Sequence, residues 1–433
     1  MIEYFRIKRR SKLIKKVLKY CLPTMFSFML VSLYSVIDGI FIGNNVGDHG
    51  LAAINIAWPM VAFITALGVG IGMGGSVLIS YERKNNKTNN DTHILNVCIT
   101  SLIIVAIIIS STLIFLYPTI LKLLGASGNT YVHASNYSLI VISGAIFQIV
   151  GAGIIPILRN YNLSIQAMFC MMFGTITNVI INYILICIYN FGISGAAIGT
   201  IIAQLSVTII ATQILKIKVN YKYHYKWDLN ILKKILKIAI TGFGISLAPS
   251  IVLIFTNLQC LNYGNDAVVA CYCVIAYIAF PAQSLLTGVG DGVQPLISYY
   301  AGANDTQNLN KVIKIGRTIN ISLSIFLTIL IISVLNYIPV WFGLSQQGSN
   351  HFHQGMIIYT LSFIFFGLFR FNLCYLNASL NVKKAIVLIM SESIIVTPLL
   401  LYILPKFFEV NGIWISSPLS VIIMLIIYYI WKD

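Results

Sequence analysis

The chain has 433 residues, of which 58% are hydrophobic and only 9% are charged, and its mean hydropathy is +0.87. Soluble domains carry about 25% charged residues, so this composition excludes a water-soluble protein and indicates one that lies largely in a membrane. The net charge of +16 does not indicate a nucleic-acid partner, because the basic residues alternate with apolar stretches instead of forming one face.

Twelve apolar stretches follow one another along the chain, and each is long enough for a membrane-spanning helix of about 20 residues. The first stretch has no small-residue cleavage site and is longer than a signal-peptide core, so we expect it to be a retained first helix. The expected spans are 20–44, 52–80, 94–117, 132–158, 163–189, 193–215, 236–263, 267–299, 314–342, 354–380, 384–405 and 411–431.

Lys and Arg recur on alternate loops. If the N-terminal segment is counted as inside, the inside segments hold every Lys and Arg except Lys122 and Lys406, which lie outside, and Arg370, which lies within a span. Lys and Arg favour the cytoplasmic side of a membrane. The sequence therefore predicts a multi-pass protein of the cell (plasma) membrane with both termini in the cytoplasm.

Two inside segments are strongly basic, RIKRR near the N-terminus and the central segment 216–237, in which aromatic residues are interleaved. A nucleic-acid site is one interpretation of such a pattern. A helix lying along the anionic inner leaflet is the favoured one, with membrane lipids as the partner.

The two halves of the chain resemble each other. Residues 70–81 read GIGMGGSVLISY and residues 288–299 read GVGDGVQPLISY, at an offset of 218, and Gly195 and Gly412 form a weaker echo at an offset of 217. Six spans per half is an even number, so the halves share one orientation and are related by an axis along the membrane normal.

The predicted fold class is therefore an all-α polytopic membrane protein with twelve transmembrane helices in two six-helix lobes, related by an internal pseudo-two-fold repeat. The expected parts are a basic cytoplasmic N-terminus (1–19), an amino-terminal lobe (20–215), a basic cytoplasmic connecting loop (216–235) and a carboxyl-terminal lobe (236–433).

Two patterns that resemble cofactor or metal sites have simpler explanations. The glycine spacing at 70–74 resembles a dinucleotide fingerprint, but it lies inside an apolar span with no flanking strand, so close helix packing is the favoured role. The eight cysteines lie almost entirely in apolar stretches without zinc-like spacing, and they predict neither disulfides nor a metal site.

The segment 23–59, which begins PTMFSFMLVSLYSVIDG, resembles the first helix and loop of the multidrug and toxic compound extrusion (MATE) family. The two LISY segments, ILRN at 157–160, NVIINYILI at 178–186, GISGAAIGT at 192–200 and GIW at 412–414 add to this resemblance, which covers essentially the whole chain. It implies a two-lobed antiporter that expels cationic, lipophilic small molecules in exchange for Na⁺ or H⁺ and needs no cofactor. We expect a monomer. The same superfamily contains lipid-linked oligosaccharide flippases, which is the alternative function.

When the charged residues counted with the loops are set aside, four ionisable residues remain within the predicted spans: Asp38, Asp291, Arg370 and Glu392. A charge in the middle of a membrane costs about 2.5–3.5 kcal/mol on insertion scales, so each of them requires a reason.

Asp38 is the first candidate for a cation-coupling residue. Counting along helices at 1.5 Å per residue places Asp38, Asn182 and Thr200 roughly 10–14 Å below the outer surface, with Asn178 one turn deeper than Asn182 on the same helix face. A carboxylate with amide and hydroxyl oxygens can take up a proton or bind Na⁺, a hard cation that prefers oxygen ligands.

These four positions match the amino-lobe cation site of the MATE family. Some members carry a second carboxylate where this chain has Asn182, which leaves the preference between proton and sodium open. The alternative interpretation is that Asp38 only makes a hydrogen bond within the lobe and that the asparagines hold helices together.

The remaining candidates lie elsewhere. Asp291 replaces Met73 at the equivalent repeat position and is a candidate for contact with a cationic substrate, as is Tyr34, one turn before Asp38; a structural role for Asp291 is an equal alternative. Arg370 and Glu392 are each 11 residues from Asn381 in the turn between two spans, so we expect them to form an ion pair. The alternatives are that Arg370 pairs with Asp291 or that Glu392 faces the central cavity.

Other functions fit less well. An intramembrane enzyme would need a constellation such as a Ser/His pair at one depth, but all six histidines fall in loops or at span edges. A flippase would line its cavity with several Arg or Lys residues, and the spans contain only Arg370. A channel is disfavoured because no filter motif is present.

Overall fold

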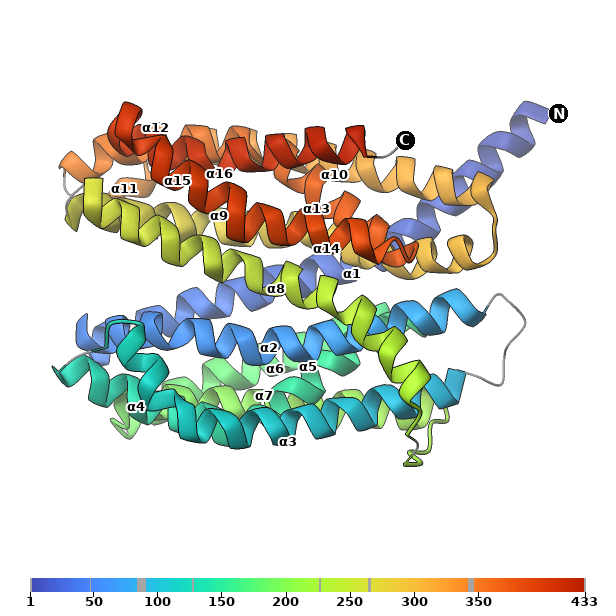
Figure 1. Cartoon of the computed structure of the whole chain (residues 1–433), viewed down its shortest axis with the longest axis horizontal. Coiled ribbons are helices and arrows are strands. Elements are labelled where there is room, and N and C mark those ends of the chain that lie inside the picture. The colour runs from blue at the N-terminus through green and yellow to red at the C-terminus, as the bar shows by residue number, and fades with distance from the viewer. Residues whose placement is uncertain are drawn as a thin grey trace. The chain divides into compact units, whose positions relative to one another are not determined.

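The structure is a computed structural model that describes residues 2–46, 48–83, 91–126, 128–225, 227–263, 266–341 and 346–431. Every regular element in these ranges is a helix (Figure 1). The first half contains α1 (Ile2–Asn45), α2 (Asp48–Arg83), α3 (Asp91–Leu123), α4 (Gly128–Ser143), α5 (Ala145–Asn160), α6 (Ser164–Asn182), the π-helix η2 (Tyr183–Ile188) and α7 (Gly192–Lys218). The second half contains α8 (Leu229–Tyr263), α9 (Asp266–Gly302), α10 (Thr306–Val334), α11 (Ile338–Trp341), α12 (Gln346–Leu361), α13 (Phe363–Ala378), α14 (Val382–Met390), the π-helix η3 (Ser391–Val396), α15 (Thr397–Ile403) and α16 (Pro405–Ile430).

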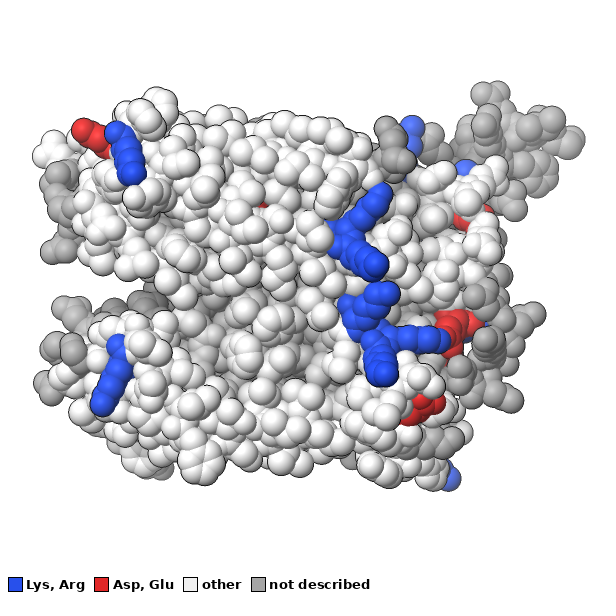
Figure 2. Space-filling model, viewed as in Figure 1, with Lys and Arg blue, Asp and Glu red and all other residues white. Residues whose placement is uncertain are grey.

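The helices account for the predicted membrane spans. Within the described residues, ten helices are long and apolar enough to cross a membrane, and two bent pairs, α4 with α5 and α12 with α13, raise the number to twelve. On the face shown in Figure 2, Lys and Arg side chains lie toward the ends of the helices, and the surface between them is almost free of charge. The predicted all-α fold with twelve spans is confirmed.

The two bends occur at serines, which the apolar pattern did not reveal. The bend is 59° between α4 and α5 and 42° between α12 and α13. The Ser143 hydroxyl donates to the Ile140 carbonyl just before Gly144, and the Ser362 hydroxyl donates to the Tyr359 carbonyl. A serine hydroxyl that competes for a helical carbonyl is a common feature of helix kinks, although the same bond at Ser76 leaves α2 unbroken.

The chain forms two compact units. Unit 1 contains residues 1–29, 248–297 and 305–433, and unit 2 contains residues 30–247 and 298–304. Residues 20–29 of α1 therefore belong to the unit formed mainly by the second half, and residues 236–247 of α8 belong to the other. The predicted division, which separated the lobes only at the connecting loop, differs from the compact units in these two segments and in residues 298–304, which belong to unit 2.

The repeated glycines explain this exchange of first helices. A Cβ atom at Gly74 would lie 2.5 Å from the Ile235 carbonyl oxygen of α8, and one at the repeat-equivalent Gly292 would lie 2.7 Å from the Cα atom of Cys21 on α1. Only a residue without a side chain allows a backbone to approach so closely. Each repeat therefore accepts the start of the first helix of the other repeat.

Glycines also pack helices within unit 2. A Cβ atom at Gly72 of α2 would lie 2.0 Å from the carbonyl oxygen of Gly153 on α5, and one at Gly68 would lie 2.4 Å from that of Ile149. This is the small-residue packing expected between membrane helices, where close van der Waals contact replaces the hydrophobic effect.

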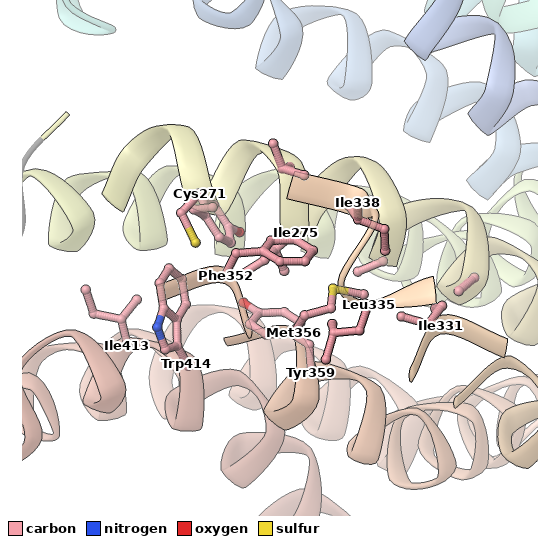
Figure 3. Packing of buried hydrophobic residues seen from close by; sticks show 14 of the residues in the cluster. Cys271, Ile275, Ile331, Leu335, Ile338, Phe352, Met356, Tyr359, Ile413 and Trp414 are labelled. Carbon is pink, nitrogen blue, oxygen red and sulfur yellow. The ribbon is translucent and has the colours of Figure 1, made fainter. Parts of the chain in front are cut away.

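The apolar core of unit 1 includes Trp414 of α16 (Figure 3). Trp414 is fully buried, its ring stacks on Tyr272 with centroids 6.1 Å apart, and a Cβ atom at Gly355 would lie 3.2 Å from it. Phe352 and Met356 of α12 belong to the same cluster. The GIW segment thus has a packing role in the second half of the chain.

The connecting segment corrects one prediction. Residues 219–225 are not helical, and they are held against the start of α3. The Tyr221 hydroxyl donates to Asn96 Oδ1 at 2.7 Å, the His224 backbone N–H donates to the same oxygen at 3.2 Å, and the Tyr223 and Thr100 hydroxyls are 3.1 Å apart. The helix expected along the inner leaflet is wrong for residues 219–225, because these hydrogen bonds hold them in an irregular segment against α3.

Candidate functional site

The four predicted coupling residues lie on three helices of unit 2. Asp38 is on α1, Asn178 and Asn182 are on α6, and Thr200 is on α7. Asn182 is fully buried, Asn178 and Thr200 are nearly so, and Asp38 is partly exposed. The helices therefore bring one acidic and three neutral polar side chains into an otherwise apolar region.

The Asn182 amide is the centre of this group. Its Nδ2 donates to Asp38 Oδ1 at 2.6 Å and to Asn178 Oδ1 at 3.3 Å. An amide with two N–H groups can make both hydrogen bonds at once. Thr200 takes a different partner: its hydroxyl donates to the Ala196 carbonyl at 3.0 Å, one turn earlier on α7. The structure thus joins Asp38, Asn182 and Asn178 in one network and places Thr200 on the adjoining helix.

Two polar atoms of this network have no hydrogen-bond partner among the described residues, Asn182 Oδ1 and Asn178 Nδ2. Buried polar atoms are nearly always paired, so such atoms require an explanation. The donor set of carboxylate, amide and hydroxyl oxygens fits a hard monovalent cation or a proton. In the arrangement seen here, Asn182 presents its nitrogen to Asp38, which suits an ionised carboxylate that accepts the hydrogen bond.

Irregular backbone surrounds Asn182. The residue ends α6, and the next six residues form the π-helix η2, a type of segment that is frequent at functional sites. Asn190 and Gly192 then adopt left-handed φ values of 57° and 55°. This tight turn sets the start of α7 and hence the position of Thr200 relative to Asn182.

Gly199 is a site residue that the sequence analysis did not identify. A Cβ atom there would lie 1.8 Å from Asn182 Oδ1 and 2.9 Å from its Cγ atom. Only glycine at this position leaves room for the amide to reach Asp38. The segment GISGAAIGT contains this glycine, but nothing in the segment indicates which side chain packs on it.

Gly199→Ala should therefore displace the Asn182 amide and impair the transport that the sequence predicts. A hydrogen bond to a charged group is worth roughly 1.5–3 kcal/mol, so we expect a loss of at least about tenfold in gradient-driven efflux. Efflux from vesicles, normalised to the amount of monodisperse protein, measures it. Ile209→Ala on the exposed side of α7 is the control. Wild-type efflux by Gly199→Ala would show that the position of the amide is unimportant.

The other predicted residues lie apart from this network. Asp291 is buried on α9 in unit 1, next to the Cys374 thiol of α13. The side chain of Tyr34 lies outside the described residues. Arg370 on α13 and Glu392 in η3 are both buried, and Arg370 Nη2 lies 4.0 Å from Glu392 Oε2. The structure thus brings these two charges together within unit 1.

Known proteins resemble this chain along almost all of its length. The multidrug export protein MepA of Staphylococcus saprophyticus is 22% identical over 98% of this chain and 95% of its own length, and that of Staphylococcus aureus is 24% identical with the same coverage.

Solved structures share the fold. An outward-facing multidrug resistance MATE family transporter of the MOP superfamily superimposes with a TM-score of 0.90, at 19% identity, over 97% of this chain and 95% of that one. The Vibrio cholerae MATE transporter VcmN gives a TM-score of 0.87, at 20% identity, over 97% and 96%. The sequence model of the MatE family matches residues 23–184 and 243–403, one stretch in each half, and the chain therefore belongs to the MatE family.

Proposed function

We propose that this protein exports cationic, lipophilic small molecules from the cell in antiport with H⁺ or Na⁺. The observation that carries the proposal is the Asp38–Asn182 hydrogen bond at 2.6 Å, an acidic side chain held by a buried amide inside a membrane span. Acidic residues in such positions are costly and mark ion pathways in transporters. The MepA relatives, whose names describe multidrug export, support the choice of substrate class.

Asp38 acts as the coupling residue in this proposal. An ionised Asp38 accepts from Asn182 and carries a negative charge, whereas a protonated or Na⁺-bound Asp38 is neutralised. That change alters the interaction between α1 and α6, and it alters the attraction of the region for a cationic substrate. Binding of the coupling ion can shift an equilibrium between two conformations only by its difference in affinity for them. Alternating access between the two units is the transport mechanism in which such a shift moves the substrate.

An efflux assay tests the proposal. The full-length protein is reconstituted into vesicles with a fluorescent lipophilic cation, and a pH gradient or a sodium gradient is imposed separately. Efflux that follows one gradient supports the proposal and identifies the coupling ion. Efflux at the protein-free rate under both gradients would contradict it.

A lipid-linked oligosaccharide flippase is the alternative function. A pyrophosphate substrate requires several cationic side chains around its path, but away from the ends of the predicted spans the only Lys or Arg is Arg370, which is buried beside Glu392. This favours export of cations over transport of an anionic lipid.

We further propose a cell-membrane location with both termini in the cytoplasm, and cysteine accessibility tests this topology. Lys222 in the connecting segment and Lys406 at the start of α16 are both exposed and belong to opposite sets of loops. In a cysteine-free background, we expect an impermeant thiol reagent applied to whole cells to label a cysteine at 406 but not one at 222. Labelling after cell lysis is the control for reactivity. The reverse pattern would overturn the orientation.

A further inference from the structure

A cavity of about 340 Å³ lies in unit 1, near the start of α10. Six residues of α10 and one of α13 line it: Asn310, Ile313, Lys314, Arg317, Thr318, Ile321 and Tyr375. The α10 positions follow one another at alternate intervals of three residues and one residue, a pattern that repeats about every helical turn, so they form one face of that helix. Two of the seven lining residues are cations and none is acidic, which gives the cavity an uncompensated positive charge.

Hydrogen bonds to two neighbouring helices, α13 and α16, hold the Arg317 side chain in position. Its Nη2 donates to Asn372 Oδ1 at 2.8 Å and lies 3.4 Å from the Tyr428 hydroxyl of α16. Asn372 is fully buried, so it holds the guanidinium in one position. Arg317 Nε is buried and has no hydrogen-bond partner among the described residues, which leaves part of its donor capacity unused.

Lys314 adds a second charge, one turn from Arg317. Its side chain is exposed, and neither cation forms an ion pair with an acidic residue in the described part of the chain. A fixed guanidinium fork beside a lysine matches the oxygens of a phosphate group, which the fork binds in two places and the ammonium binds as a point charge.

The cavity lies where a membrane surface meets its apolar interior. Arg317 is the last charged residue of α10, and the helix continues through the apolar run that ends at Val334. The Tyr428 hydroxyl beside Arg317 belongs to the last turn of α16, which ends at Ile430. Aromatic side chains at such helix ends, here Tyr428 and the half-exposed Trp431, are typical of the headgroup region.

We propose that this cavity binds the phosphate group of an anionic membrane lipid. Lys314 and Arg317 hold the phosphate oxygens, and the Asn310 side chain supplies a further hydrogen bond. Ile321, one turn beyond Arg317 toward the apolar run, extends the cavity along the lipid tail. A free phosphate ion would satisfy the same cations, but it would leave Ile313 and Ile321 without a partner. Basic pockets between membrane helices at a membrane surface bind anionic headgroups in this way.

The test uses the purified full-length protein in a neutral detergent and measures its melting temperature as lipid is added. Phosphatidylglycerol should raise the melting temperature in a saturable way, because a ligand that binds only the folded protein stabilises it. Phosphatidylcholine should not. Lys314→Gln should weaken the apparent affinity for phosphatidylglycerol about fivefold, the factor that corresponds to ~1 kcal/mol for one basic residue near a lipid surface.

Lys311→Gln is the matched control. Lys311 is exposed on the same helix, three residues before Lys314, but it does not line the cavity. Its loss should leave the affinity within about twofold of wild type. Equal weakening by both substitutions would show a diffuse surface attraction and would overturn the proposal. Inorganic phosphate that stabilises the protein as much as the lipid does would overturn the assignment to a lipid.

Arg317→Lys separates the guanidinium geometry from the charge. It keeps the positive charge but loses the planar fork, so phosphatidylglycerol binding should weaken although the net charge is unchanged. The melting temperature without lipid reports whether loss of the Asn372 contact affects folding. Undiminished lipid binding by this variant would contradict the role assigned to Arg317.

Discussion

Asp38→Asn should abolish gradient-driven efflux while the protein still folds and inserts. Asp38 is the only acidic residue within the predicted spans of the amino-terminal half, so no other carboxylate there can replace its charge. The substitution keeps the shape of the side chain, and an amide oxygen at position 38 can still accept from Asn182. Packing between α1 and α6 should therefore persist, and only the ionisable group is lost. Efflux in the reconstituted assay should fall to the rate seen without a gradient.

Glu82→Gln is the matched control for this experiment. It makes the same chemical change in the same unit, at the end of α2, where Glu82 lies 3.7 Å from the largely exposed Lys234. Lys234 is 60% exposed, so water screens this pair, and we expect the efflux of Glu82→Gln to match wild type. Wild-type efflux by Asp38→Asn, with a normal amount of monodisperse protein, would show that the coupling residue is elsewhere. That result would leave membership of the family untouched.

The sequence predicted the parts of this fold that depend on apolar length and helical rise. Long apolar runs gave the spans, and counting residues from the helix ends placed Asp38 and Asn182 at similar depth. The structure has them 2.6 Å apart. The same counting from Asn381 placed Arg370 level with Glu392, and these side chains are 4.0 Å apart. Depth along a straight helix follows from 1.5 Å per residue, so it needs no knowledge of what packs where.

Other features of the fold depend on contacts between distant segments, so the pattern within any one segment could not predict them. The repeated glycines were visible, but they do not say that Gly74 packs on α8 or Gly292 on α1. The basic, aromatic pattern at 216–237 is compatible both with an interfacial helix and with an irregular segment. The hydrogen bonds that hold the irregular segment go to Asn96, which is more than 100 residues away in the sequence. Gly199 could not be identified from the sequence for the same reason, because its role depends on its contact with Asn182.

Breaking the Arg370–Glu392 pair should have the second large effect, on folding. Both side chains are about 95% buried, so the membrane and the protein leave neither charge in contact with water. Arg370 also lies over the Phe366 ring, 5.1 Å from its centroid, but its Nη1 and Glu392 Oε2 have no hydrogen-bond partner among the described residues. The pair thus compensates two buried charges through attraction more than through well-formed hydrogen bonds.

Arg370→Ala and Glu392→Ala should each reduce the yield of folded protein sharply, because removing one partner of a buried pair typically costs about 3–5 kcal/mol. The cost arises from the charge that remains, not from the contact that is lost. The double substitution Arg370→Met with Glu392→Met should therefore be better tolerated than either single change. The charge-swapped double variant should also recover part of the yield.

The yield of monodisperse protein and its melting temperature, measured for the two single and two double variants, test this coupling. A pair that acts as a unit makes both double variants more stable than the less stable single variant. If the double variants are no better than the worse single variant, each charge has its own partner and the pair should be abandoned. If Glu392→Ala alone folds normally but loses efflux, Glu392 acts in transport, and its proximity to Arg370 then serves to position it. The four variants therefore distinguish a structural pair from a second functional acid in unit 1.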